Sequence, residues 1–316
     1  MTSNRISSGS SLTRTLGHRA RRNPSLVASV ALLLFVAGTL TAAKPTPTPT
    51  PVVTATPTPT PTPVVTTTPT PAGLAGKIAY SCSGICLFNL ASGTNTLIAT
   101  SGVNPKISPD GTRIVFQGCG GICVMNADGT NPTTVSNFGG IPAWSPDGMQ
   151  IVFGANPGIW KMNADGTGLT QLANHGRWPA WSPATIQPAQ IAFSSNLNSP
   201  DDDLWSMSLD GSNARKILAR AGEDLDVVWS SSGQIVFGGS VDQRASYEIF
   251  AFNPGTLSLS RLTNSPKQDF EPGASPDGSM IAFSSFRNPA GIYIMNADGS
   301  SPRLIIAGGR QPSWGP

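Results

Sequence analysis

The sequence of 316 residues is poor in charged residues, which make up 12% of it, about half of the usual share in soluble domains. Coiled coils, charged disordered tails and nucleic-acid-binding surfaces need many more charges, so these classes are excluded. The charges are also unevenly placed, because residues 1–76 hold six basic and no acidic residues, whereas residues 77–316 hold 14 basic and 17 acidic ones. We therefore expect no nucleic-acid partner.

Histidine and catalytic motifs are equally scarce. The chain has two histidines, and His175 is the only one after residue 76. A Ser-His-Asp triad would depend on it, and no G-x-S-x-G, HExxH, Walker A or dinucleotide-binding pattern is present. The sequence therefore predicts a protein that is not an enzyme and has no organic cofactor.

The first 76 residues predict export rather than a folded domain. Residues 1–23 are polar and basic, and residues 24–43 form an apolar tract typical of a signal peptide or of a short membrane-spanning helix. Residues 44–76 are rich in Thr-Pro, which favours polyproline II and gives no core. We expect an N-terminal apolar helix and an extended Thr-Pro stalk, with everything after them outside the cytoplasm.

What the sequence has in quantity is a repeat of short strands separated by turns. Ser-Pro-Asp-Gly occurs at 108–111, 145–148 and 275–278, and Asn-Ala-Asp-Gly occurs at 126–129, 163–166 and 296–299. Both patterns suit tight turns. A short strand precedes each first turn and another follows it, for example 114–116, 151–153 and 281–283. The unit has four antiparallel strands in about 40 residues, which predicts a β-propeller blade.

The two ends of residues 77–316 complete one another. The segment begins with a second strand at 77–80 and ends with residues 311–316, in which Trp314 takes the place of Trp144 and Trp181. We expect the C-terminal strand to pair with the N-terminal blade, because this closes the ring without an open edge. The predicted fold is all-β, a six-bladed β-propeller over residues 77–316.

These motifs resemble the repeat of the TolB-like six-bladed β-propeller family. The best matches are residues 142–148 with 162–166, and residues 275–278 with 292–299. The resemblance covers residues 77–316 and implies an extracytoplasmic role in binding proteins. TolB itself carries an α/β domain ahead of its propeller, and this chain has the Thr-Pro stalk in that place.

The four cysteines follow the repeat. Cys82 and Cys86, and then Cys119 and Cys123, are two C-x3-C pairs that flank the hairpin between second and third strands in successive blades. Facing residues of a hairpin are within reach of a disulfide, and export permits oxidation. We expect the disulfides Cys82–Cys86 and Cys119–Cys123; free thiols, cross-blade disulfides and a metal site of four thiolates remain alternatives.

The candidate ligand-binding residues lie in loops that lead into the first strands. We expect them at the rim of the central channel, and they are His175, Arg177, Trp178, Asp224, Asp226, Asp269 and Glu271. Carboxylates from neighbouring blades there suit a cation such as Ca²⁺ or the basic end of a peptide. Ordinary solvated loop charges are the alternative.

The sequence as a whole predicts an exported, membrane-tethered propeller that binds a protein partner at the cell envelope and is monomeric. The competing interpretation is a propeller that binds an envelope glycan or small ligand, including a lyase or a hydrolase.

Overall fold

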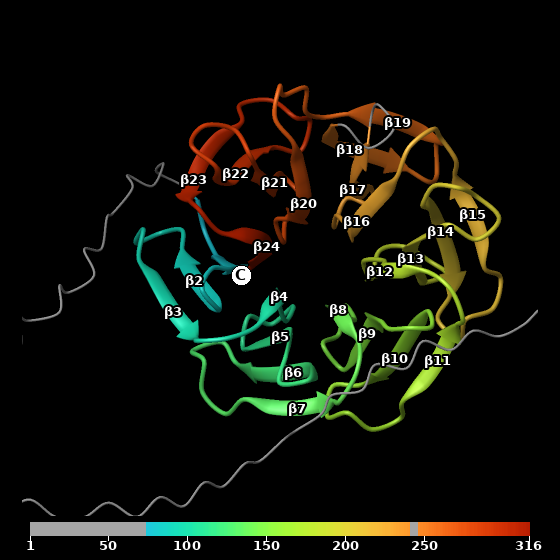
Figure 1. Ribbon diagram of the computed structural model, residues 1–316, viewed down its shortest axis with the longest axis horizontal. Helices are drawn as coiled ribbons and strands as arrows, with labels where there is room; N and C mark the ends of the chain where they lie inside the picture. The colour runs from blue at the N-terminus through green and yellow to red at the C-terminus, as the bar shows by residue number, and fades with distance from the viewer. Residues whose placement is uncertain (1–73, 241–245) are drawn as a thin grey trace, which may run out of the picture. The chain divides into compact units, whose positions relative to one another are not determined.

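Each repeat of the sequence forms a sheet of four antiparallel strands, and six such sheets surround a central axis (Figure 1). The structure is a computed structural model and describes residues 74–240 and 246–316. The predicted apolar segment 24–43 and nearly all of the Thr-Pro stalk lie outside these residues. Within the described ranges no helix is long and apolar enough to cross a membrane.

The strands are numbered along the chain, and within each blade they follow one another from the axis outwards. Blade 1 consists of β24 (Arg310–Gly315), β1 (Lys77–Ser81), β2 (Ile85–Asn89) and β3 (Asn95–Ala99). Blade 2 consists of β4 (Val103–Ile107), β5 (Arg113–Gly118), β6 (Gly121–Asn126) and β7 (Thr133–Ser136). Blade 3 consists of β8 (Gly140–Trp144), β9 (Gln150–Gly154), β10 (Ile159–Asn163) and β11 (Thr170–Ala173).

The other three blades repeat this order. Blade 4 consists of β12 (Arg177–Trp181), β13 (Gln190–Ser195), β14 (Asp203–Ser208) and β15 (Arg215–Leu218). Blade 5 consists of β16 (Asp224–Trp229), β17 (Ile235–Ser240), β18 (Tyr247–Asn253) and β19 (Ser258–Arg261). Blade 6 consists of β20 (Asp269–Ala274), β21 (Met280–Ser285), β22 (Gly291–Asn296) and β23 (Arg303–Ala307).

The Ser-Pro-Asp-Gly turns set the register between the first and second strands of a blade. The Ser108 hydroxyl donates to Asp110 Oδ1 over 2.5 Å and accepts from the Arg113 amide over 2.9 Å. The same bonds recur at Ser145 and Ser275. Because each turn satisfies its own polar groups, the strands on either side can enter the core without leaving buried donors unpaired.

The ring is closed by its last strand, as the sequence predicts. β24 pairs with β1 antiparallel, with Ile78 opposite Trp314 and Lys77 opposite Gly315. Trp314 is buried in a core cluster shared with blade 6. The two chain ends of the propeller therefore share one sheet, and no inner edge is left open. The all-β, six-bladed prediction is confirmed.

Candidate functional site

The innermost strand of every blade is bulged at the same place. A register shift interrupts the pairing of each inner strand with its neighbour. A residue with φ between 51° and 58° lies at each shift, and the six are Asn104, Ile141, Trp178, Asp226, Glu271 and Gln311. Such a φ is uncommon for residues other than glycine, and a bulge redirects side chains. We call these six residues the mouth ring.

Prolines accompany the bulges. Proline follows the mouth-ring residue in five of the six inner strands, and Val227 takes that place in blade 5. Proline has no amide hydrogen for the ladder, so it is tolerated in a sheet at a bulge or an edge. The repeated proline is therefore the local signal that positions the mouth ring.

Hydrogen bonds between blades connect four of the six residues of the mouth ring. The Asn104 amide donates to Gln311 Oε1 over 3.1 Å, and the Gln311 amide donates to Glu271 Oε2 over 3.1 Å. The Glu271 amide in turn donates to the Asp226 carboxylate. The remaining two residues of the ring are Ile141 and Trp178, so the ring has a polar part of four residues and an apolar part of two.

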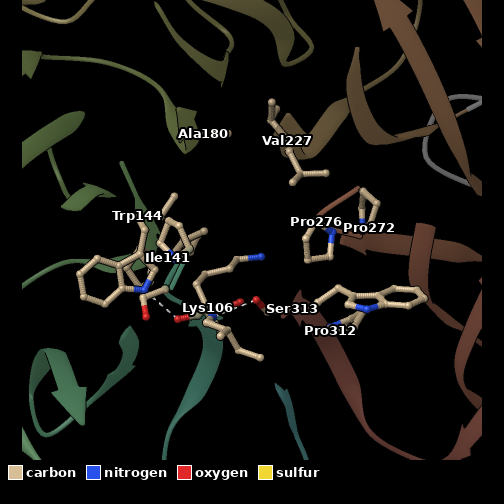
Figure 2. Close-up of a pocket in the computed structure, with 18 of the residues that line it drawn as sticks. Lys106, Ile141, Trp144, Ala180, Val227, Pro272, Pro276, Pro312 and Ser313 are labelled. Atoms are coloured by element: carbon tan, nitrogen blue, oxygen red, sulfur yellow. Dashed lines mark hydrogen bonds between the residues drawn. The ribbon is translucent and has the colours of Figure 1, made fainter. Parts of the chain in front are cut away.

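A cavity of about 450 Å³ lies on the axis, and all six residues of the mouth ring help to line it. Prolines of the inner strands and of the Ser-Pro-Asp-Gly turns line it, together with Trp144 and Trp314. Figure 2 shows Lys106 of β4 reaching into this cavity between Trp144 on one side and Pro276 and Pro312 on the other. The axis of the propeller is thus a largely apolar cavity with one ammonium group in it.

Three titratable groups share the cavity. Burial lowers the pKa of Lys106, and the charges of Asp226 and Glu271 oppose that shift. Burial, followed by the charge of Glu271, raises the pKa of Asp226 to about 7. Glu271 itself accepts from Arg310 over 2.8 Å and from the Ser284 hydroxyl over 2.7 Å. Burial therefore disfavours the charged forms of Lys106 and Asp226, whereas Glu271 is held by hydrogen bonds.

Three of the seven residues predicted at the rim line the cavity: Trp178, Asp226 and Glu271. His175 does not. Its Nδ1 lies 2.9 Å from the Ser195 hydroxyl, and its ring packs against Phe193 and Trp205. Burial lowers the pKa of His175, as expected for an imidazole packed against aromatic rings.

Arg177, Asp224 and Asp269 are also outside the cavity, and each has a partner of opposite charge. Arg177 pairs with Asp202 and stacks on Trp178, with its guanidinium carbon 4.2 Å from the ring centre. Asp224 and Asp269 are fully buried at the first position of β16 and β20.

The two buried aspartates form ion pairs with arginines from nearby loops. Arg220 lies 2.6 Å from Asp224, and Arg287 lies 2.6 Å from Asp269. Within the described residues there is no group of three or more His, Cys, Asp or Glu placed to hold a metal ion. A calcium ion at the rim stays a prediction.

The members of each cysteine pair lie close together but do not face one another in the hairpin, because Cys86 is opposite Tyr80 and Cys123 is opposite Phe116. The Cα atoms are 5.9 Å apart in the pair Cys82 and Cys86, and 6.5 Å apart in the pair Cys119 and Cys123. Both separations are within the range that a disulfide spans. Cys86 and Cys123 are buried. The two disulfides stay a prediction, now with both pairs in contact.

The sequence argument missed Lys106, although a signal was available. Aligning the six inner strands places Lys106 with Ala143, Ala180, Val228, Gly273 and Ser313. A lysine among small residues at one repeat position marks a departure that packing does not require. β4 departs from the repeat a second time, because it ends with Ile107 where β8, β12 and β16 end with tryptophan.

The raised pKa of Asp226 predicts how stability depends on pH. The folded state holds a proton on Asp226 at pH values where an unfolded aspartate is ionised, so stability falls as pH rises from about 4 to about 7. The Asp226→Asn variant should lose the part of this dependence that Asp226 contributes, up to about 4 kcal/mol between the two ends of that range. Part of the slope should remain, because burial also raises the pKa of Asp224 to about 7. Urea unfolding of both proteins at several pH values measures it.

A suitable control is Asp128→Asn, which changes an exposed turn aspartate whose pKa is lowered by bonds from Thr130. That group acts only at lower pH, so this variant should keep the wild-type slope between pH 4 and 7. Equal slopes for wild type and Asp226→Asn would show that Asp226 is ionised throughout.

The architecture defines a six-bladed β-propeller with an open axial cavity, and this is the fold of TolB-like proteins. No protein-family model matches the sequence. TolB from Acinetobacter baumannii superposes with a TM-score of 0.65 at 16% identity, over 76% of this chain and 66% of that chain. About a third of that TolB chain therefore has no counterpart in this one.

Two further solved structures have the same fold. A putative TolB from Agrobacterium tumefaciens gives a TM-score of 0.60 at 19% identity, over 75% of this chain and 91% of that chain. A chain of a nidogen/laminin complex gives 0.59 at 14% identity, over 72% of this chain and 92% of that chain. Identities this low show the fold and nothing more.

Proposed function

We propose that this protein is an exported, membrane-tethered and non-enzymatic propeller that binds a protein partner through its mouth ring. The observation that carries the proposal is the ring itself, which has one residue at a bulge from each of six blades, four of them joined by bonds between blades. A preformed surface loses little entropy on binding. Its polar and apolar parts suit an amphipathic segment of a partner.

Arginines stacked on aromatic rings flank the mouth ring. The Arg310 guanidinium lies 4.7 Å from the ring centre of Phe270 and 5.8 Å from that of Phe286, which is 46% exposed. On the other side of the ring, Arg177 stacks on Trp178. Arginine and large aromatic residues dominate the binding energy of protein interfaces, so these pairs supply anchors for a partner.

The location outside the cytoplasm rests on the sequence and on the cysteines. The basic segment 1–23 followed by the apolar segment 24–43 is typical of export, and the Thr-Pro stalk would hold the propeller away from the membrane. Two cysteine pairs in contact suit an oxidising compartment. Both termini of the propeller lie in one closed sheet, which suits a monomer.

Site-specific photocrosslinking in intact cells tests the proposal. A photoreactive amino acid at Phe286 should capture one discrete protein, because Phe286 lies beside the mouth ring. Leu257 is the matched control, since it is 72% exposed and lies in the turn between the third and fourth strands, at the opposite end of its blade. Equal capture at both positions would mean that the mouth ring is not the interface.

Variants of the flanking anchors complete the test. The captured partner, once purified, should bind the propeller with an affinity about tenfold or more lower after Arg310→Ala or Trp178→Ala, as expected for anchor residues. Unchanged affinity in both variants would contradict binding through this face.

A second candidate is a propeller that binds an envelope glycan or another small ligand, with lyase or hydrolase activity as its catalytic form. The axial cavity is the observation that favours it. Solved hydrolases share this fold, but the histidine that a triad would need lies outside the cavity, against Ser195.

A further inference from the structure

Lys106 is an exception to the repeat at a position that lines the axial cavity. The equivalent positions in the other five inner strands hold Ala143, Ala180, Val228, Gly273 and Ser313. These small side chains leave the axis open, and Lys106 extends into that space (Figure 2). Burying an ammonium group costs free energy, and the five other blades show that packing does not need it.

Among the described residues, no side chain or carbonyl is hydrogen-bonded or ion-paired to the Lys106 ammonium. Lys161 Nζ, by contrast, donates to the Leu209 carbonyl over 2.8 Å, and Lys216 Nζ lies 2.6 Å from Asp203. Lys106 is half-buried, and an ammonium has three donors. These donors are available to a ligand in the cavity.

The two carboxylates that line the cavity, Asp226 and Glu271, are not hydrogen-bonded to Lys106. Glu271 is held by Arg310, by Ser284 and by the Gln311 amide. Asp226 accepts from the Glu271 amide, and its pKa of about 7 leaves it partly protonated at neutral pH. A further negative charge beside Lys106 would therefore be balanced by a cation that has no direct partner.

The lining of the cavity restricts which ligands could accept a hydrogen bond from Lys106. One ammonium suits a single negative charge, whereas phosphate groups are normally held by several donors or by arginine forks. Most of the lining consists of proline, alanine, valine, isoleucine and tryptophan side chains, with serines, Asn104, Gln311 and the two carboxylates as the polar part. A lining of this kind favours a ligand with an apolar body. A volume of about 450 Å³ is within the usual range of small-molecule sites.

We propose that the axial cavity binds a small organic carboxylate, whose carboxylate group pairs with the Lys106 ammonium and whose apolar body packs against the proline and tryptophan walls. The mouth-ring residues help to line this cavity, but binding of a small acid at Lys106 does not require a protein partner. The carboxylate belongs to a free acid, and a carboxylate carried by a peptide terminus is the competing source.

Matched acids and amides test the proposal. Phenylacetate, indole-3-acetate and 4-methylvalerate are compared with their neutral amides by ligand-observed NMR and calorimetry at pH 7. At least one acid should bind, with an affinity about tenfold or more above that of its amide, because a hydrogen bond to a charged group has that effect. Binding of none of the acids, or equal binding of acid and amide, would overturn the proposal.

Lys106→Met keeps the length of the side chain and removes its charge. It should weaken binding of the acid about tenfold or more and leave the amide unchanged. Lys267→Met, which removes an exposed lysine outside the cavity, should bind like wild type. Tight binding of the acid by Lys106→Met would overturn the assignment of Lys106.

A measurement on the protein without substitutions avoids the possibility that a variant fails to fold. Lysines are converted to ¹³C-dimethyllysine, and the pKa of the Lys106 signal is followed by NMR. A bound acid should raise that pKa, because an opposite charge favours the ammonium form, whereas the amide should not. A shift produced only by peptides with a free C-terminal carboxylate, and by none of the acids, would replace the small acid with a protein terminus.

Discussion

Removal of residues 310–316 is expected to abolish the cooperative unfolding transition of the propeller. The deletion takes away the whole of β24, exposes the inner edge of β1 and removes Trp314 from the core of blade 1. Loss of a buried tryptophan alone costs about 3–5 kcal/mol, against a typical net stability of about 5–15 kcal/mol. Differential scanning calorimetry measures the transition.

β24 also connects blade 1 to both of its neighbours, so its loss reaches beyond one sheet. The Ser313 hydroxyl accepts from the Ile107 amide of blade 2 over 3.0 Å, and the Gln311 amide donates to Glu271 of blade 6. The ring would therefore open at two interfaces at once. This is why we expect loss of the cooperative transition rather than a lower melting temperature.

Two controls make the deletion informative. A chain lacking only Pro316 keeps all of β24 and should melt like wild type. A synthetic peptide of residues 310–316, added to the truncated chain, should restore part of the transition by adding a strand to the open edge. A truncated chain that melts cooperatively near the wild-type temperature would mean that blade 1 holds without its inner strand.

The fold was predictable because turns with recognisable sequences separate the strands of each repeat. The sequence predicts a strand before each Ser-Pro-Asp-Gly turn, and β4, β8 and β20 end at Ile107, Trp144 and Ala274, directly before those turns. In three of the blades the strand is followed by a turn whose serine and aspartate bond to one another and to the backbone. These bonds join residues that are close together in the sequence, so the turns can be recognised from the sequence alone.

The candidate site was less predictable because its electrostatics depend on residues brought together by the fold. The sequence predicts Asp224 and Asp269 to be loop carboxylates that are available to a ligand. In the structure they form ion pairs with Arg220 and Arg287. Of the predicted rim residues, those that line the axial cavity lie at the bulge of an inner strand and not before it. Which carboxylate is paired is a property of the assembled ring.

The cysteine pairs occupy positions that other blades give to aromatic residues. Cys86 and Cys123 follow the first buried isoleucine of the third strand, where blades 3 to 6 have Trp160, Trp205, Phe250 and Tyr293. Those aromatic rings pack against neighbouring rings. Blades 1 and 2 have cysteines in place of those rings, and the predicted disulfides would cross-link the same hairpins instead.

Replacing Arg287 with methionine is expected to destabilise the propeller by about 3–5 kcal/mol, because it leaves a buried carboxylate without its cation. Asp269 is fully buried and has two partners, Arg287 over 2.6 Å and the Ser285 hydroxyl over 2.6 Å. Burial already raises the pKa of Asp269, and Arg287 opposes that rise. Urea unfolding at neutral pH measures the loss.

The charge pair can be separated from the size of the side chain. Arg287→Met combined with Asp269→Asn should recover most of the lost stability, because the asparagine is neutral and can still accept from Ser285. Arg215→Met, which changes an exposed arginine of β15, should cost less than about 1 kcal/mol. Because a raised carboxyl pKa favours folding only while the proton is held, the Arg287→Met defect should shrink as pH falls toward 4. A defect that does not vary with pH and is not relieved by Asp269→Asn would show that Arg287 acts through its packing against Phe283 and Tyr293.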